Sequence, residues 1–374
     1  TEILANQHFD SISKLLEDFN INVEILTGST PQKSRNIIHQ KLLNQEIHIL
    51  IGTHAILEDI VKFKNLGIAI IDEQHRFGVA QRAKLWKKNT SPPHILVMTA
   101  TPIPRTLAMS VYGDLDISII KELPPGRKKT TTVHRYDKDR LSVYKFLRDQ
   151  IKLGRQVYIV YPLINESEKL DYKDLVDGYE SMLRDFPRPE YQVGILHGKM
   201  KSIDKNIEME RFVNNKTQIL VSTTVIEVGV NIPNASVMMI ESSERFGLSQ
   251  LHQLRGRVGR GNDESYCILM TKDNLSNDAK TRTDTMVQID DGFKLSEVDL
   301  KLRGPGDVLG TKQSGILKFK IADIINDHDI LANARDCVSE ILSNDPKLKS
   351  PSNSLIREYI SQSGKSKNLW RYIS

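Results

Sequence analysis

The sequence predicts an α/β protein built on parallel sheets, and three observations support this fold class. Continuous apolar runs recur along the chain, helical patterns lie between them, and polar residues follow where several runs end. Parallel strands read as continuous apolar runs because helices cover both faces of the sheet. Ligands of such sheets bind beyond the carboxyl ends of the strands. The polar residues at those ends are therefore the first candidates for a site.

Residues 1–123 form the first predicted domain. Apolar residues recur at helical spacing between Phe9 and Phe19, which predicts a helix. The runs predicted to be strands are Val23–Leu26, Ile47–Ile51, Gly67–Ile71 and His94–Met98. The third run ends in Asp72-Glu73 and the fourth in Thr99-Ala100-Thr101, so both carry polar residues where a ligand would bind.

A linker and a second predicted α/β domain, residues 124–274, follow. Pro124-Pro125-Gly126 interrupts the pattern, and Arg127-Lys128-Lys129 comes directly after it, as is typical of an interdomain linker. The basic run is most simply solvated, with contact to a nucleic-acid backbone as the alternative. Predicted strands are Val157–Tyr161, Tyr191–Leu196, Gln218–Val221 and Val237–Ile240, and predicted helices are Tyr172–Arg184 and Ile203–Val213.

Residues 275–374 form a predicted C-terminal extension, in which the regular alternation stops. Glycines and prolines cluster first, and Ile321–Leu342 then has a helical pattern. Gly364-Lys365-Ser366 resembles the end of a P-loop, but Tyr359 stands where that motif requires glycine. The preceding segment, Ser354–Ser361, reads as a helix, whereas a P-loop follows a strand. This stretch is therefore not expected to bind nucleotide.

The composition excludes several classes of protein. The chain has 374 residues, 26% of them charged and 39% hydrophobic, so it is neither collagen-like nor disordered. Its only cysteines, Cys267 and Cys337, are too few for a disulfide scaffold or a four-cysteine zinc site, and they favour a reducing compartment. The apolar runs are far shorter than the ~20 residues of a membrane helix. The opening Thr1-Glu2-Ile3 has neither Met nor a signal-peptide pattern, which predicts a piece of a longer protein.

Asp72-Glu73 is a candidate catalytic pair. Nucleotide hydrolases use one acid to hold Mg²⁺ and another to position or deprotonate the attacking water. The alternative is a helix N-cap with an acidic first turn. His75 could ligate a metal, but because no second His lies at helical spacing, polar coupling inside a domain cleft is favoured.

The segment Gln253–Gly261 interleaves arginines with glycines. Glycine lets a backbone approach a phosphate closely, and each guanidinium offers forked donors to developing negative charge. Arg257 and Arg260 are thus candidates for stabilising phosphoryl transfer. The alternative is a basic loop that faces nucleic acid. A net charge of +5 is compatible with a polyanionic partner without identifying one.

Taken in order, these segments resemble the motifs of superfamily 2 helicases, and most closely those of the RecG family of branch-migration helicases. The matching segments are Thr1–His8 (motif Ia), Leu26–Ser29 and Gly52–Ala55 (the next DNA-contacting segments), Asp72–Val79 (motif II), Thr99–Thr106 (motif III), Leu196–Met200 (motif IVa), Ser222–Pro233 (motif V) and Gln250–Gly261 (motif VI). Transcription-repair coupling factors share most of these motifs. Glu122–Arg127, Leu302–Asp307 and Gln313–Gly315 favour the RecG family instead.

The resemblance implies tandem RecA-like parallel-sheet domains, the first one truncated, with a C-terminal helical hairpin and loop. It implies ATP and Mg²⁺ as cofactors, and places a wedge domain and a P-loop before the position that matches Thr1. Asp72 would coordinate Mg²⁺, Glu73 would activate water, and Arg257 and Arg260 would approach the γ-phosphate from the opposite domain.

Further roles follow from the same resemblance. The residues implied to couple the nucleotide state to DNA are Gln74, His75, Thr99, Thr101, Glu227, Gly229 and Gln253. Those implied to contact DNA are Gly28, Thr53, His54, His197, Gly198, Thr223 and Thr224. Those implied to belong to a translocation motif are Arg282, Arg303 and Gln313. Asn231 stands where many relatives have Asp, which gives that side chain a weak role.

The implied function is an ATP-dependent DNA helicase or translocase for recombination and repair. It would act on branched duplex DNA by regressing forks and migrating Holliday junctions. The implied setting is the bacterial cytoplasm without a membrane, as a monomer, with single-stranded-DNA-binding protein as a candidate partner. One alternative is a duplex translocase similar to the coupling factor, and another is a non-catalytic DNA-binding module, because the chain lacks a P-loop. A hydrolase of small phosphorylated substrates would leave the arginines without a purpose.

Overall fold

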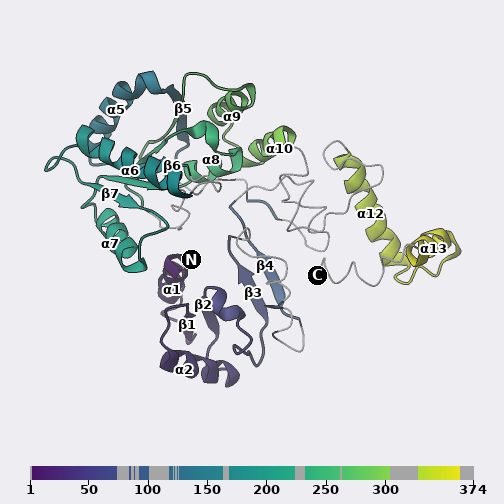
Figure 1. The fold of residues 1–374 in the computed structure, drawn as a ribbon. Helices are drawn as coiled ribbons and strands as arrows, with labels where there is room; N and C mark the ends of the chain where they lie inside the picture. The colour runs from purple at the N-terminus through teal and green to yellow at the C-terminus, as the bar shows by residue number, and fades with distance from the viewer. Residues whose placement is uncertain are drawn as a thin grey trace. The chain divides into compact units, whose positions relative to one another are not determined.

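The computed structural model describes most of the chain and shows the predicted α/β fold (Figure 1). The described residues are 2–73, 84–85, 88, 92–100, 118–120, 122, 124, 126–162, 168–223, 232–261, 263–303 and 327–362. Every strand pairing among them is parallel. None of the helices in these ranges has the length and apolar composition needed to cross a bilayer.

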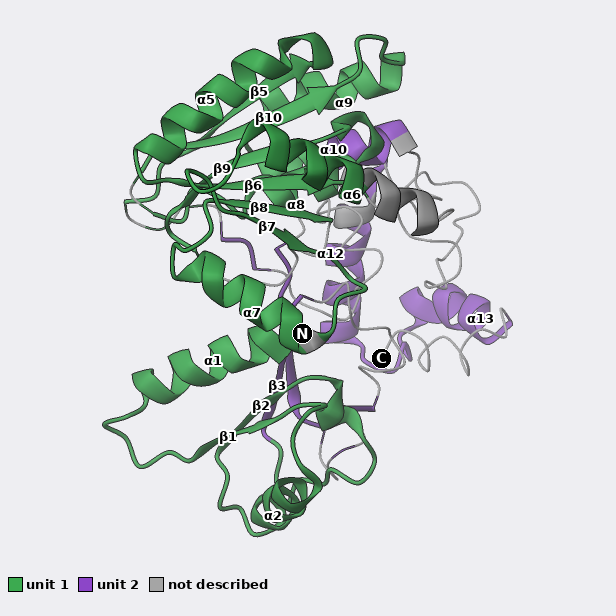
Figure 2. Ribbon diagram, turned by 60° about the vertical axis from the view of Figure 1, so that its left-hand side comes forward, with its two compact units in different colours: residues 1–66, 122–295 green, residues 67–121, 296–374 purple. Residues whose placement is uncertain are grey.

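The chain divides into two compact units (Figure 2). Unit 1 comprises residues 1–66 and 122–295, and unit 2 comprises residues 67–121 and 296–374. The domain boundaries expected after residues 123 and 274 stay predictions.

A six-stranded parallel sheet forms the larger part of unit 1, with the strand order β5-β10-β9-β6-β8-β7. Its strands are β5 (Thr130–Tyr136), β6 (Gln156–Tyr161), β7 (Val193–Leu196), β8 (Ile219–Thr223), β9 (Ala235–Ile240) and β10 (Ser265–Thr271). The accompanying helices are α5 (Arg140–Lys152), α6 (Glu168–Asp185), α7 (Ser202–Val213), α8 (Leu248–Arg255) and α9 (Asn277–Gln288). The strands and helices predicted in this region are thus confirmed to within a few residues.

Helices cover both faces of this sheet. On one face Ile159 of β6 belongs to a buried cluster with Leu147 of α5 and Met182 of α6. On the other face the Tyr158 ring packs against Phe212 of α7 with ring centroids 4.9 Å apart. Every residue of β8 and β9 is buried as a result. This two-sided burial explains why the central strands are continuous apolar runs.

Several elements of unit 1 carry no continuous apolar run and were therefore not predicted from the sequence. The strand β5 lies at a sheet edge and begins with three threonines, which are β-branched but polar. The helix α2 (Gln32–Leu43) buries only Ile38 and Leu42, four residues apart on one face. In both cases packing against neighbouring elements stabilises a polar segment whose local pattern is weak.

A separate pair of parallel strands lies near the N-terminus. The pair consists of β1 (Val23–Leu26) and β2 (Ile49–Gly52), with α1 (Glu2–Leu15), α2 and a 3-10 turn (His54–Leu57) around it. Leu26, Ile38 and Val61 belong to its buried core. The helix predicted to reach Phe19 ends at Leu15 instead, and hydrogen-bonded turns continue the chain.

Unit 2 contains a third parallel pair, β3 (Ile68–Ile71) and β4 (His94–Val97). Ile68 and Ile70 are 54% and 59% exposed, and Leu96 of β4 is also exposed. One face of this pair is therefore open, whereas its apolar run predicted two covered faces.

The C-terminal extension is helical where it is described. Its helices are α10 (Gly292–Arg303), α12 (His328–Asn344) and α13 (Ser354–Gln362), with a 3-10 turn at Pro351–Asn353. The predicted helix Ile321–Leu342 is confirmed from residue 328, and its first residues lie outside the described ranges. The helical prediction for residues 354–361 is also confirmed, which removes the strand that a P-loop would follow.

Candidate nucleotide and DNA sites

The acidic pair Asp72-Glu73 follows β3 directly. Asp72 Oδ1 accepts the backbone N–H of Glu73 at 2.8 Å, and both residues are half-buried. Glu73 has φ +53°, a left-handed conformation that is uncommon for a residue with a side chain. Strained backbone of this kind concentrates at functional sites. The alternative interpretation as a helix N-cap concerns residues after 73, which lie outside the described ranges.

Thr99 lies at the same sheet edge as the acids. β3 and β4 pair in register with Ile71 opposite Val97, and the Met98 N–H donates to Ile71 O at 2.8 Å. Residues 72 and 98 are thus opposite one another, and Thr99 follows as an exposed residue. The structure therefore brings segments similar to motifs II and III together at the carboxyl edge of β3 and β4.

The helix α8 positions the candidate arginines. Leu248, Leu251 and Leu254 are buried on one face of the helix, and Gln250 closes its first turn by accepting the Gly247 N–H at 3.1 Å. Gln253 is half-buried. The helix ends at Arg255, and residues 256–261, which we name the arginine loop, continue from it.

Tight packing fixes the arginine loop. Val258 is fully buried between the half-buried Arg257 and Arg260. Gly259 has φ +72°, and a Cβ there would lie 2.5 Å from Ser265 Oγ. A Cβ at Gly261 would lie 2.9 Å from the carbonyl oxygen of Pro233. The glycines are thus required for close packing and for a positive φ, in addition to any approach to phosphate.

The two candidate arginines act electrostatically on β6. Burial raises the pKa of the Tyr158 hydroxyl, and the positive charges of Arg260 and Arg257 oppose that rise. The Arg260 Nε donates to the Gly256 carbonyl oxygen at 3.4 Å, within the loop itself. The two arginines are thus close enough to Tyr158 of β6 for their positive charges to lower the pKa of its hydroxyl.

Arg255 is a buried structural arginine that the sequence analysis did not separate from its neighbours. It is only 5% exposed, and its guanidinium donates to the carbonyl oxygens of Met286 and Ile289 at 3.0 Å and of Asp290 at 3.1 Å. It also donates to His252 Nδ1 at 3.0 Å. Burial, followed by the Arg255 charge, lowers the pKa of His252 to about 4. Helical spacing places Arg255 on the leucine face of α8, which is the signal that could have identified it.

Arg282, a candidate translocation residue, contacts the segment that enters α8. It lies on α9 and donates to the carbonyl oxygens of Glu244 at 3.1 Å and Phe246 at 3.3 Å. Together with Arg255, it ties α9 and residues 286–290 to both ends of the helix that leads into the arginine loop.

Three of the candidate DNA contacts meet at the carboxyl edge of β1 and β2. Leu26 pairs with Gly52, so Gly28 on one side and Thr53 and His54 on the other follow neighbouring strands. The Thr53 N–H donates to Leu26 O at 3.3 Å.

Two charged side chains hold the loop after β1. Arg35 of α2 donates to the carbonyl oxygens of Thr27 at 2.7 Å and Thr30 at 3.1 Å. Glu2 accepts the hydroxyls of Thr27 and Ser29. Neither Arg35 nor Glu2 was singled out from the sequence, because single polar residues in helical segments carry no signal.

A second set of candidate DNA contacts lies at the carboxyl edge of β7 and β8. Leu196 pairs with Ser222, so His197 and Gly198 lie beside Thr223. The Lys205 ammonium donates to the Gly198 carbonyl oxygen at 2.8 Å. Burial, then Lys205 and Lys199, lower the pKa of His197. The charged form of the imidazole is therefore disfavoured in this loop, whose lysines are positively charged.

The remaining predicted residues receive no structural test. Gln74, His75, Thr101, Thr224, Glu227, Gly229, Asn231 and Gln313 lie outside the described ranges, as does the side chain of Arg303. The acids belong to unit 2 and the arginines to unit 1. Their meeting at one nucleotide therefore stays a prediction.

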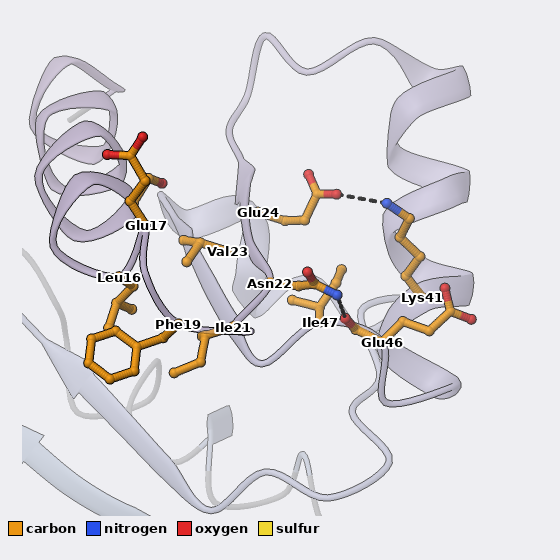
Figure 3. Close-up of a pocket in the computed structure, with 11 residues that line it drawn as sticks. Leu16, Glu17, Phe19, Ile21, Asn22, Val23, Glu24, Lys41, Glu46 and Ile47 are labelled. Atoms are coloured by element: carbon orange, nitrogen blue, oxygen red, sulfur yellow. Dashed lines mark hydrogen bonds and ion pairs between the residues drawn. The ribbon is translucent and has the colours of Figure 1, made fainter.

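A pocket of about 420 Å³ lies beside the β1–β2 pair (Figure 3). Its lining comes from the end of α1, the starts of β1 and β2 and the end of α2, and includes the Glu24–Lys41 ion pair at 2.9 Å. It lies at the amino ends of the strands and contains none of the predicted site residues. The pocket is thus no candidate for the nucleotide site.

Three family models match successive parts of the chain. Residues 1–110 match the DEAD/DEAH box helicase model, and residues 141–262 match the helicase conserved C-terminal domain. Residues 289–374 match the model described as ATP-dependent DNA helicase RecG, domain 3, C-terminal.

Curated relatives decide the family. The ATP-dependent DNA helicase RecG of Bacillus subtilis is 49% identical over 365 residues, which cover 97% of this chain and 53% of that protein. RecG of Aquifex aeolicus is 50% identical over 355 residues, covering 93% of this chain and 44% of the relative. The chain belongs to the RecG family. It spans about half the length of the curated RecG proteins that it matches.

Solved structures agree with this assignment. The structure of RecG bound to a three-way DNA junction matches with a TM-score of 0.70 and 43% identity, over 88% of this chain and 42% of that one. Yeast Dbp5 bound to RNA and ADP BeF3 matches with a TM-score of 0.54 at 14% identity, over 80% of this chain and 78% of that one. The second likeness shows the fold alone.

The acids of this RecG-family chain fit a Mg²⁺ ion. Carboxylate oxygens are hard ligands, and Mg²⁺ is usually held by one or two carboxylates together with substrate phosphates. Asp72, whose carboxylate is oriented by the Glu73 N–H, supplies such a ligand at the strand end. In the part of the chain that the structure describes, no group of three or more His, Cys, Asp or Glu side chains could hold a metal.

Proposed function

We propose that the protein containing this chain is an ATP-dependent helicase or translocase that acts on branched DNA. It would regress replication forks and migrate Holliday junctions in the bacterial cytoplasm. The bacterial source of the RecG relatives supports this setting. We also propose that it works as a monomer, with single-stranded-DNA-binding protein as a partner.

In the proposed reaction Asp72 would hold Mg²⁺, and Glu73 would orient and deprotonate the attacking water. Mg²⁺ would supply neutralisation of the phosphate charge. Arg257 and Arg260 would donate to the γ-phosphate oxygens, where negative charge accumulates in the transition state. The fixed backbone of the arginine loop supports this role, because preorganised donors need no rearrangement during the reaction.

DNA would bind along the carboxyl edges of the β1–β2 and β7–β8 pairs. Backbone groups, hydroxyls and lysines at those edges match the chemistry of phosphate contacts, which carry no sequence information. Binding should therefore select DNA structure and weaken as salt rises. Arg282 and Arg255 would transmit the state of the arginine loop to the C-terminal extension.

The observation that carries the proposal is the match to RecG bound to a three-way DNA junction, at 43% identity over 88% of this chain.

The test measures ATP hydrolysis by the full-length protein on a three-way junction and on linear duplex of equal length. Glu73→Gln keeps the shape of the side chain and removes its basicity. We expect it to reduce hydrolysis by roughly 10³-fold or more, with ATP still bound in a filter assay. Glu17→Gln, at an exposed carboxylate outside the site, is the control and should retain wild-type turnover.

Two outcomes would contradict the proposal. Wild-type turnover by Glu73→Gln would remove Glu73 from catalysis. Equal stimulation by the junction and the linear duplex would remove the preference for branched DNA and favour a general duplex translocase.

A further inference from the structure

Arg127, in the segment that enters β5, contacts the arginine loop. Its Nε donates to the carbonyl oxygen of Gly259 at 2.9 Å, across 132 positions of sequence. The sequence suggested a solvated linker or a nucleic-acid contact for Arg127-Lys128-Lys129. The structure assigns Arg127 instead to the backbone of the loop that carries Arg257 and Arg260.

The segment that carries Arg127 has a defined shape. The Arg127 N–H donates to the Pro124 carbonyl oxygen at 3.1 Å, and Gly126 has φ +80°. This hydrogen bond and the left-handed glycine form a turn that leads directly into Arg127. The direction of the Arg127 side chain therefore depends on this turn. A change in its geometry would displace the guanidinium.

The receiving carbonyl belongs to the most constrained residue of the loop. Gly259 is buried at φ +72°, and the Thr130 and Ser265 hydroxyls, 2.9 Å from one another, close the space beside it. Arg257 and Arg260 flank this segment. A shift of the Gly259 carbonyl would therefore move the backbone from which the Arg257 and Arg260 side chains extend.

The neighbouring residues of the segment behave differently. Lys128 is exposed, and Lys129 is an exposed partner of Asp290 with an Nζ–Oδ2 distance of 3.6 Å. Of the three basic residues, only Arg127 is half-buried. The run thus contains one side chain that contacts the arginine loop and a chemically similar neighbour that serves as a control.

We propose that Arg127 is a positioning residue for phosphoryl transfer. It transmits the geometry of the 124–127 turn to the arginine loop and holds Arg257 and Arg260 where they meet the γ-phosphate. This inference rests on the proposed function, because it assumes that the two arginines act on ATP.

The test is a double-mutant cycle in the full-length protein with junction DNA at saturation. It compares wild type, Arg127→Ala, Arg257→Ala and the double variant, with kcat and the KM for ATP measured for each. We expect Arg127→Ala to lower kcat roughly tenfold with KM within about twofold, because displaced catalytic groups reduce the chemical step. In the Arg257→Ala background the same substitution should have a smaller effect on kcat, because only the displacement of Arg260 then remains.

Three further variants distinguish a positioning role of Arg127 from a loss of protein stability and from the loss of a positive charge. Lys128→Ala removes an adjacent positive charge and should leave kcat within about twofold. Arg127→Lys retains a donor and should recover part of the lost rate. Gly126→Ala keeps the guanidinium but strains the turn at φ +80°, so it should lower kcat as Arg127→Ala does.

The outcomes are distinguishable. Equal kcat values for Arg127→Ala and Lys128→Ala, or multiplicative effects of Arg127→Ala and Arg257→Ala, would overturn the positioning role. Arg127→Ala could lower kcat only because it destabilises the protein, which a lower unfolding temperature would reveal. In that case the kcat of folded Gly126→Ala tests the positioning role. A wild-type kcat for Gly126→Ala overturns the role, and a reduced kcat supports it. Wild-type kcat in Arg257→Ala would instead overturn the proposed function.

Discussion

The six-stranded sheet of unit 1 and the β3–β4 pair of unit 2 are built from similar apolar runs but differ in burial. Every residue of β8 and β9 is buried. In β3 the burial alternates, and Ile68 and Ile70 are exposed. A continuous apolar run therefore predicts a strand and the sheet type, whereas what covers the strand depends on distant elements.

The two regions also differ in how polar groups are held. Unit 1 buries Arg255 within a set of backbone carbonyls and places Glu241 at the end of β9 with two hydrogen bonds from Arg140. In unit 2 the described acids at the end of β3 stay half-buried. Polar groups in a well-covered sheet are costly to disturb, because each would lose its partner without gaining water. The following substitutions measure that difference.

The largest expected effect comes from one isoleucine truncation made in each region. Ile159→Ala, in the fully buried centre of β6, should lower the free energy of unfolding by about 4 kcal/mol, from lost burial and the cavity left behind. Ile70→Ala, at a 59% exposed position of β3, should cost less than about 1 kcal/mol. Urea unfolding followed by circular dichroism measures both. An equally large loss for Ile70→Ala would show that the exposed face is covered in the full-length protein.

The next largest effect concerns the ion pair between Arg140 and Glu241. The two carboxylate oxygens of Glu241 accept from Arg140 at 2.5 and 2.9 Å, and the Glu241 side chain is 5% exposed. Arg140→Met leaves this carboxylate buried without its partner, so stability at pH 7 should fall by about 3 kcal/mol. Lys41→Met breaks the half-buried pair with Glu24, whose side chains are 40% and 33% exposed, and should change stability far less.

A second substitution separates the loss of the Arg140–Glu241 attraction from the cost of leaving the Glu241 carboxylate buried without its partner. Adding Glu241→Gln to Arg140→Met removes the buried charge and should restore part of the stability. No recovery in the double variant would mean that packing by the Arg140 side chain, rather than its charge, accounts for the loss.

Sequence patterns anticipated the parallel fold and most of the strands because buried strands carry a strong apolar signal. They also placed Asp72 and Thr99 at the carboxyl ends of their strands, and the pairing of β3 with β4 puts both residues at one sheet edge. They did not anticipate Arg255, because an arginine that donates to backbone carbonyls has no partner visible in the sequence. Contacts such as Arg127 with Gly259 depend on tertiary packing and could not be predicted from spacing.

His252 should make unit 1 sensitive to acid. Its folded pKa is about 4, because burial and Arg255 disfavour the imidazolium, and Nδ1 already accepts from Arg255. The unfolded chain takes up a proton near pH 6.5, so stability is unaffected above that pH and falls as pH drops toward 4. At pH 5 the loss should be roughly 2 kcal/mol relative to His252→Gln, which keeps an acceptor but does not titrate.

The measurement is the urea midpoint of both proteins between pH 7 and pH 4.5. His48→Gln, at an exposed residue that accepts the Asn22 N–H at 3.0 Å, is the reference for losing an imidazole at the surface. Parallel pH curves for wild type and His252→Gln would show that the buried imidazole gains a proton in the folded state.

The smallest expected effect compares two helix starts. Ser276 caps α9 by accepting the Ala279 N–H at 3.3 Å, so Ser276→Ala should cost about 1 kcal/mol and Ser276→Gly a few tenths. Pro31 stands at the N-cap of α2 without a side-chain cap. Pro31→Ser adds a side-chain acceptor for the first turn of α2 but also raises the conformational entropy of the unfolded chain. Because these effects oppose one another, the stability should stay within about 0.5 kcal/mol of the wild-type value. A gain in stability near 1 kcal/mol in Pro31→Ser would show that the new cap outweighs the added entropy of the unfolded chain. The stability of α2 would then depend on its N-cap more than on its few buried residues.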